Sequence, residues 1–168
     1  PCRYRVLGRT RDDAAGEAYD KVARMLGLGY PGGPAIDRLA RQGDPRAVAF
    51  ARPLLPGTWD FSFAGIKTAV LYHLRDLKRK PTRRQTVDLC ASFQEAVVET
   101  LVKKTVSAAE RYGVRQVVVG GGVAANARLR EVFAEAARSR GLRLSIPPPV
   151  LCTDNGAMLA QAASHRLR

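Results

Sequence analysis

Apolar and small residues recur at helical spacing along much of this chain. A first helix is predicted from Asp12 and Asp13, whose carboxylates can cap it, to about Leu26, and Gly27 is placed to end it. The longest apolar repeat, Asp88 to about Tyr112, predicts the longest helix. The same spacing predicts further helices near 36–41, 65–77, 125–140 and 155–165.

Short β-branched runs predict strands between the later helices. Arg115–Val119 and Leu142–Ile146 have this composition, and Asp60–Phe63 alternates like a further strand. Helix–strand–helix–strand–helix order indicates an α/β fold, with a sheet that we expect to be covered on both faces. We therefore expect a helical region over about residues 12–110 and an α/β end over about 113–168.

The stretch Gln116–Arg130 carries the clearest chemical signal. Gly120, Gly121 and Gly122 follow an apolar strand and precede a helix. Glycine lets a backbone approach a ligand closely, and a helix N-terminus favours negative charge. The pattern is typical of a loop that holds an adenine nucleotide or another phosphate ester. The alternative is an ordinary strand-to-helix turn.

The charge balance points to an anionic partner. The 168 residues carry a net charge of +13, and most of the basic residues are Arg. This favours nucleic acid as a partner, and the alternative is an Arg-rich composition set by genome codon bias. The densest cluster, Arg75 to Arg84 around Pro81, either contacts phosphate or is simply solvated. Because no apolar run reaches about 18 residues, we expect no membrane partner.

The cysteines and the first residues bear on cellular context. Cys2, Cys90 and Cys152 are far apart and odd in number, which favours reduced thiols and a cytoplasmic location over a disulfide framework or a zinc site. The chain begins at Pro1 without an initiator Met or a signal-peptide pattern. We therefore expect it to be a piece of a longer protein.

Six sequence blocks together resemble one known family. They are DDAAGEAYDK at 12–21, YPGGP at 30–34, FSFAGIK at 61–67, ASFQE at 91–95, GGGVAAN at 120–126 and CTDNGA at 152–157. In order and spacing they resemble the bacterial tRNA N6-adenosine threonylcarbamoyltransferase family. The resemblance implies a nucleotide-binding lobe of the actin/Hsp70/sugar-kinase fold superfamily (ASKHA), with a helical insertion. Residues 1–168 then correspond to the C-terminal part of the enzyme, without its N-terminal lobe.

The resemblance assigns substrate contacts to four residues in addition to Gly120, Gly121 and Gly122. Asp20 is implied to bind the ribose hydroxyls, and its alternative is an ion pair with Lys21 or Lys67. Gly33 lets the backbone of its loop approach the nucleoside, and Asp37 is assigned to the same contact. The alternative for Asp37 is that it is only a solvent-exposed charge on a helix. Asn126 is implied to contact the adenosine, with a purely structural helix cap as its alternative.

A metal ligand is implied at Asp154. In the family this carboxylate joins two histidines of the N-terminal lobe around one divalent ion, iron(II) or zinc, a familiar ligand set. The present chain contains only His73 and His165, which do not form the family's His-x-x-x-His motif. The alternative for Asp154 is the N-cap of the last helix. Because one carboxylate is too few ligands, we expect no tight metal binding by this chain alone.

The implied reaction moves a threonylcarbamoyl group from threonylcarbamoyl-AMP to N6 of the adenosine beside the tRNA anticodon. No catalytic residue is assigned, and the chain is expected to be inactive by itself. A paralogous partner subunit and a small ATPase are the implied protein partners. Two other functions are open: an ATP-dependent kinase or ATPase of the same superfamily, and a non-catalytic scaffold that binds nucleotide or tRNA.

Overall fold

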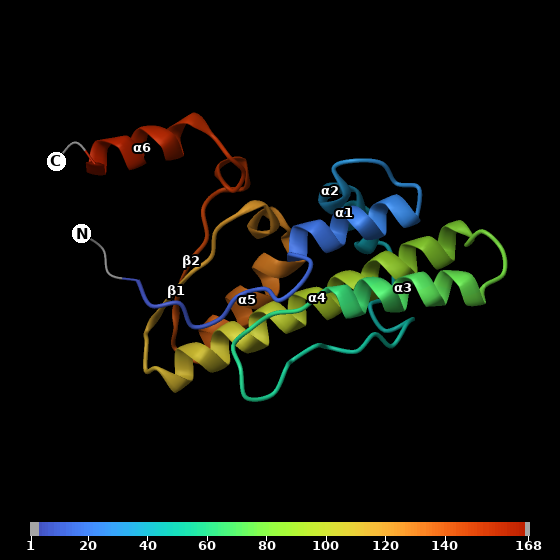
Figure 1. The fold of residues 1–168 in the computed structure, drawn as a ribbon, viewed down its shortest axis with the longest axis horizontal. Coiled ribbons are helices and arrows are strands. Elements are labelled where there is room, and N and C mark those ends of the chain that lie inside the picture. The colour runs from blue at the N-terminus through green and yellow to red at the C-terminus, as the bar shows by residue number, and fades with distance from the viewer. Residues whose placement is uncertain (1–3, 167–168) are drawn as a thin grey trace.

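The long helix α4 is the axis of the molecule. A computed structural model describes residues 4–166, in which α4 spans Arg83–Arg111. Figure 1 shows the helices α1, α2 and α3 beside the first half of α4, and α5 with a small sheet beside its second half. The first three helices are Ala15–Met25, Gly32–Ala40 and Ala64–Asp76. Cys2 lies outside the described residues.

The four helices α1 to α4 enclose one hydrophobic cluster. Tyr19 of α1 packs edge-on against Phe93 of α4, with ring centroids 5.1 Å apart, and both side chains are buried. Ile36 of α2 and Val70 of α3 are completely buried in the same cluster. The predicted helices over this region are therefore confirmed, and Gly27 ends α1 with a φ of 69° that favours glycine.

The second half of α4 packs against an α/β unit. The strands β1, Gln116–Val118, and β2, Arg143–Ser145, pair in parallel, with Val117 opposite Leu144. The helix α5, Ala127–Ser139, connects them and contacts α4. Val117 points into this second hydrophobic cluster, whereas Val118 is 70% exposed. The described sheet is therefore covered on one face, and the prediction of two covered faces is wrong for it.

Three local predictions fail because contacts distant in sequence decide the structure. Asp12 and Asp13 do not cap α1, whose N-cap is Ala14. Instead Asp12 accepts hydrogen bonds from the backbone N–H groups at the start of α3, and Asp13 pairs with Lys21 and Lys67. The segment 60–63 forms no strand, only an isolated bridge between Phe61 and Thr10.

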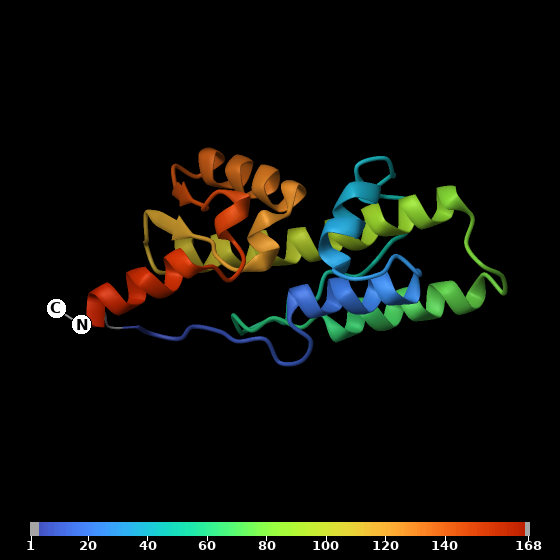
Figure 2. The same cartoon turned by 90° about the horizontal axis from the view of Figure 1, so that it is seen from above.

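The helix α4 begins five residues before the predicted start. Thr82 and Gln85 form a reciprocal capping box, in which each side chain accepts a hydrogen bond from the other residue's backbone N–H. The last helix α6, Gly156–Arg166, is exposed through residue 165 and lies apart from the helical region (Figure 2). Among the described helices, none has the length and apolar character needed to cross a membrane.

Candidate nucleotide site

A cavity of about 610 Å³ lies where the two halves of the molecule meet. Its walls come from α1, α2, the loop before α2, and the short 3-10 helix η1, Gly122–Ala125. Four of the predicted site residues line it: Asp20, Gly33, Asp37 and Asn126. The other lining residues are Gly16, Tyr19, Pro31, Pro34, Gly122, Val123, Ala125 and Thr153.

Asp20 keeps one carboxylate oxygen for the cavity. Its Oδ1 accepts a hydrogen bond of 2.8 Å from the backbone N–H of Gly32, which joins α1 to the start of α2. The alternative partners, Lys21 and Lys67, both pair with Asp13 instead. No described donor contacts Oδ2 of Asp20, so this oxygen can accept a hydroxyl from a ligand.

The two glycines that begin α2 have different roles. A Cβ on Gly32 would lie 2.6 Å from Cβ of Ala23 and 2.8 Å from the backbone of Asp20, so close packing of α1 on α2 requires glycine there. A Cβ on Gly33 would meet no protein atom within 4 Å. The packing of the protein therefore does not require glycine at position 33, but the missing side chain leaves open space in the cavity.

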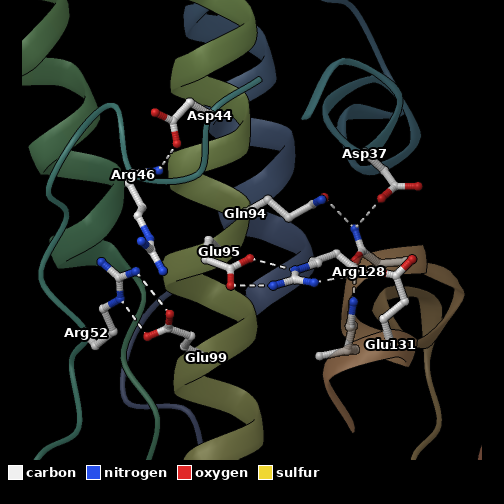
Figure 3. A network of polar contacts seen from close by, with 11 residues as sticks. Asp37, Asp44, Arg46, Arg52, Gln94, Glu95, Glu99, Arg128 and Glu131 are labelled. Atoms are coloured by element: carbon white, nitrogen blue, oxygen red, sulfur yellow. Dashed lines mark hydrogen bonds and ion pairs between the residues drawn. The ribbon is translucent and has the colours of Figure 1, made fainter. Parts of the chain in front are cut away.

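Asn126 holds three elements together at the cavity edge. Its Oδ1 accepts from the backbone N–H of Leu129, so the structure confirms the capping of α5. Its Nδ2 donates to Oε1 of Gln94 at 2.7 Å and to Oδ1 of Asp37 at 3.2 Å. In Figure 3, dashed lines drawn from the labelled Gln94 and Asp37 mark these contacts. Because both amide hydrogens are used within the protein, Asn126 orients the cavity wall and has little left to donate to a ligand.

An ion pair reinforces the same junction. Arg128 of α5 makes two hydrogen bonds of 2.8 Å to the carboxylate of Glu95 on α4, and a weaker contact to Glu131 (Figure 3). The paired carboxylate of Glu95 raises the pKa of the Arg128 guanidinium. Gln94 and Glu95 belong to the sequence block 91–95, to which no role was assigned. Their contacts explain that block: it joins α4 to the first turn of α5.

Tyr19 is a further cavity residue to which the sequence assigned no site role. Its ring lines the cavity, and its buried hydroxyl has no hydrogen-bond partner among the described residues. Burial is the main cause that raises the pKa of this phenol, with the carboxylates of Asp37 and Glu95 adding to it. Tyr19 therefore stays neutral beside the cavity.

The triple glycine does not lead directly into α5. Gly121 adopts a φ of 92°, which favours glycine, and η1 then separates the glycines from the helix. As a result α5 begins at Ala127, after the predicted 125. Of the three glycines, only Gly122 lines the cavity. Contacts of Gly120 and Gly121 with a ligand stay a prediction.

The sequence profile described as "tRNA N6-adenosine threonylcarbamoyltransferase" matches residues 2–161. The chain belongs to this family. A relative from Symbiobacterium thermophilum with that name is 57% identical over 167 residues, which are 99% of this chain and 48% of the relative. Relatives of the same name from Trichlorobacter lovleyi and Geobacter metallireducens are 59% and 58% identical, over 95% and 94% of this chain and 47% of each relative. The chain thus spans about half the length of these threonylcarbamoyltransferases.

A solved structure outside these relatives has the same fold. The crystal structure of T. kodakarensis HypF superposes with a TM-score of 0.65 at 20% identity, over 89% of this chain and 19% of that one. At this identity the similarity concerns the fold alone. It agrees with an α/β chain of helices around a small parallel sheet.

The metal ligand implied at Asp154 by the threonylcarbamoyltransferase resemblance stays a prediction. Asp154 is exposed and lies next to the cavity residue Thr153. Asn155, not Asp154, accepts from the backbone N–H of Met158 at the start of α6, so the capping alternative for Asp154 is wrong. Within residues 4–166, no three His, Cys, Asp or Glu side chains gather in a way that could hold a metal ion. The described residues alone therefore do not supply a complete set of metal ligands.

Proposed function

We propose that this chain forms the nucleotide-binding part of a tRNA N6-adenosine threonylcarbamoyltransferase. Its substrates would be threonylcarbamoyl-AMP and the adenosine beside the tRNA anticodon. The observation that carries the proposal is one cavity lined by Asp20, Gly33, Asp37 and Asn126 in a member of this family. The ASKHA superfamily fold, with an N-terminal lobe completing the enzyme, belongs to the same proposal.

The reaction is acyl transfer from a mixed anhydride to an exocyclic amine. The amine nitrogen forms a bond to the carbamoyl carbon, AMP leaves with the electrons of the broken C–O bond, and the amine loses a proton. Because AMP is a good leaving group, no covalent protein nucleophile is needed. The main task of the protein is then to hold the two reactants in the orientation needed for the transfer.

Each wall of the cavity has a part in that positioning. The free Oδ2 of Asp20 would accept a ribose hydroxyl, and the open space at Gly33 would admit the nucleoside. Asn126 and Asp37 would keep α5 and α2 at a fixed separation across the ligand. A metal ion at Asp154 would need further ligands, because one carboxylate is too few. A paralogous subunit and a small ATPase are proposed as partners in the cytoplasm.

Calorimetric titration of ADP and of a stable threonylcarbamoyl-adenylate analogue into the chain tests the nucleotide site. We expect saturable binding of both, weakened about tenfold or more by Asp20→Ala, because a hydrogen bond to a charged group contributes about 1.5–3 kcal/mol. Asp76→Ala, which removes an exposed carboxylate at the end of α3, is the matched control and should bind normally. Equal binding by all three proteins would contradict the assignment of Asp20.

A chimera tests the reaction itself. Residues 4–161 would replace the corresponding part of the Symbiobacterium thermophilum relative, which is 57% identical to this chain. Supplied with threonylcarbamoyl-AMP, tRNA and the partner proteins, the chimera should produce the modified nucleoside, detected by mass spectrometry. The Asp20→Ala chimera should produce much less. A chimera that binds the adenylate but releases phosphate from ATP without modifying tRNA would favour the kinase or ATPase alternative.

A further inference from the structure

A second cavity, of about 540 Å³, lies along the C-terminal half of α4. Its other wall is the segment between α2 and α3, which runs beside this part of α4 in Figure 1. It shares no lining residue with the nucleotide cavity. We call it the α4 groove, and its lining residues are Leu54, Leu55, Pro56, Gly57, Thr58, Trp59, Lys103, Lys104, Ser107, Arg111 and Tyr112.

The α4 groove is positively charged. Lys103, Lys104 and Arg111 line it, and its lining includes no acidic residue. Lys103 contacts Glu99 at 3.6 Å, but that carboxylate is already held by Arg52 at 3.0 Å. Arg111 is exposed and has no ion pair within the described part of the chain. The groove therefore offers two cations to an anionic ligand.

Lys104 has a different role from its neighbours. Its side chain is only 6% exposed, and its Nζ donates to the backbone carbonyl oxygens of Thr58 and Asp60. Burial lowers the pKa of this ammonium group, partly opposed by the charge of Asp60. Because Trp59 stands between those two carbonyl groups in sequence, Lys104 fixes the segment that carries it.

Two aromatic rings lie within the same groove. The ring centroids of Trp59 and Tyr112 are 6.2 Å apart at a tilt of 56°, and Arg5 lies over the Tyr112 ring at 5.5 Å. Both rings keep part of their surface exposed, 41% in the case of Tyr112. Proteins bind unpaired bases on such aromatic faces and hold the phosphates between them with Lys and Arg.

We propose that the α4 groove binds single-stranded RNA, with a base against Trp59 and Tyr112 and phosphates at Lys103 and Arg111. The proposal rests on the proposed function insofar as tRNA is its substrate. The groove would hold an unpaired segment of that RNA away from the reacting adenosine. The basic turn between α3 and α4 is the competing surface, because its cations are exposed.

Trp59 makes a direct test possible, because it is the only tryptophan of the chain. A short oligouridylate titrated into the chain should quench or shift the tryptophan fluorescence in a saturable way. Anisotropy of the same RNA, labelled with fluorescein, then gives the affinity of each variant. Trp59→Leu should weaken binding about tenfold, since stacking of one base contributes this order of affinity.

A matched pair of double variants locates the phosphates. Lys103→Ala with Arg111→Ala should weaken RNA binding strongly, and should lower the slope of log affinity against log salt by about 1.4, because each phosphate contact to a single strand contributes about 0.7. Lys80→Ala with Arg83→Ala removes the same charge from the α3–α4 turn and should have the smaller effect. A larger loss in the turn variant, or no response of Trp59 to RNA, would overturn the proposal.

Two further measurements separate this result from the nucleotide site. The groove variants should bind ADP and unfold thermally like the parent chain, which distinguishes lost RNA contacts from misfolding. RNA binding at the groove by a chain whose chimera does not modify tRNA would support the groove and contradict the proposed function. Polyglutamate that quenches Trp59 and binds as tightly as RNA would instead indicate an acidic protein partner, and would contradict an RNA site.

Discussion

The two halves of α4 differ in how completely their apolar surface is covered. Along the first half, α1, α2 and α3 surround residues such as Phe93, which is completely buried. Along the second half, α5 and one face of a two-stranded sheet cover Val102 and Val106. The opposite sheet face, at Val118, is exposed. One continuous helix therefore serves an enclosed helical core and a more open α/β unit.

This difference explains where the candidate site lies. The candidate nucleotide cavity is at the junction, where α1 and α2 of the enclosed half meet η1 and the start of α5. Gln94, in the middle of α4, connects the two through Asn126. One wall of the cavity would thus belong to the enclosed first half. The other wall belongs to the second half, and a few polar contacts determine its position.

The largest expected contrast is between core phenylalanines of the two halves. Phe93→Ala should lower the free energy of unfolding by about 3–5 kcal/mol, because surrounding helices prevent the cavity from collapsing. Phe133→Ala, in the cluster beside the sheet, should cost less, since that side can relax. Urea unfolding of both variants measures the contrast. Equal losses would mean that the open sheet face does not loosen the second core.

The next contrast involves the adjacent glycines at the start of α2. Gly32→Ala should destabilise the chain by about 1–3 kcal/mol, because its methyl group would overlap α1. Gly33→Ala meets no protein atom, so its stability should be unchanged or up to about 1 kcal/mol higher, as alanine favours helix. Its methyl group should nevertheless weaken ADP binding. Thermal unfolding and calorimetry separate the two effects; unimpaired ADP binding by Gly33→Ala would place the ligand elsewhere.

Local patterns located the helices and the two paired strands of this fold, but they also predicted a strand at 60–63 that does not form, and they did not predict the contacts between elements. Helical spacing located every described α-helix, and the Thr82–Gln85 pattern even contains the capping box that sets the start of α4. Asp12 and Asp13 were misassigned because their partners lie about 50 residues away or, for Lys21, eight residues later within α1. Which sheet face is covered depends on packing between elements, which periodicity does not encode.

The candidate site shows the same limit. Asp20, Gly33, Asp37 and Asn126 were identified together from the family resemblance, and they line one cavity. Their contacts with a ligand stay a prediction. Gln94 was missed because its hydrogen bond to Asn126 joins residues 32 positions apart, with no local pattern to indicate it. Trp59 and Tyr112 were missed for the same reason.

A smaller effect is expected at the ion pair that joins the halves. Arg128→Ala leaves the mostly buried carboxylate of Glu95 without its partner and should cost about 1–2 kcal/mol, a value limited by the exposure of Arg128. Arg128→Lys keeps the charge but not the double hydrogen bond, so it should fall in between. Arg138→Ala, on the exposed last turn of α5, is the control. Identical urea midpoints for Arg128→Ala and this control would show that the pair does not hold α5.

The smallest expected effect is a change of about 1 kcal/mol in the free energy of unfolding when Asp13, in the enclosed half, loses its charge in acid. Hydrogen bonds from Lys21 and Lys67 lower the pKa of Asp13. As the pH falls, the unfolded chain binds a proton at Asp13 before the folded chain does, so this stabilisation is complete above about pH 5 and is lost progressively as the pH falls toward the lowered pKa of the folded state. Asp13→Asn should therefore unfold more easily at neutral pH and lose less stability in acid, whereas exposed Asp76→Asn should follow the parent chain. Parallel stability curves for the parent chain and Asp13→Asn between pH 3 and pH 7 would exclude this ion-pair cluster as a source of acid sensitivity.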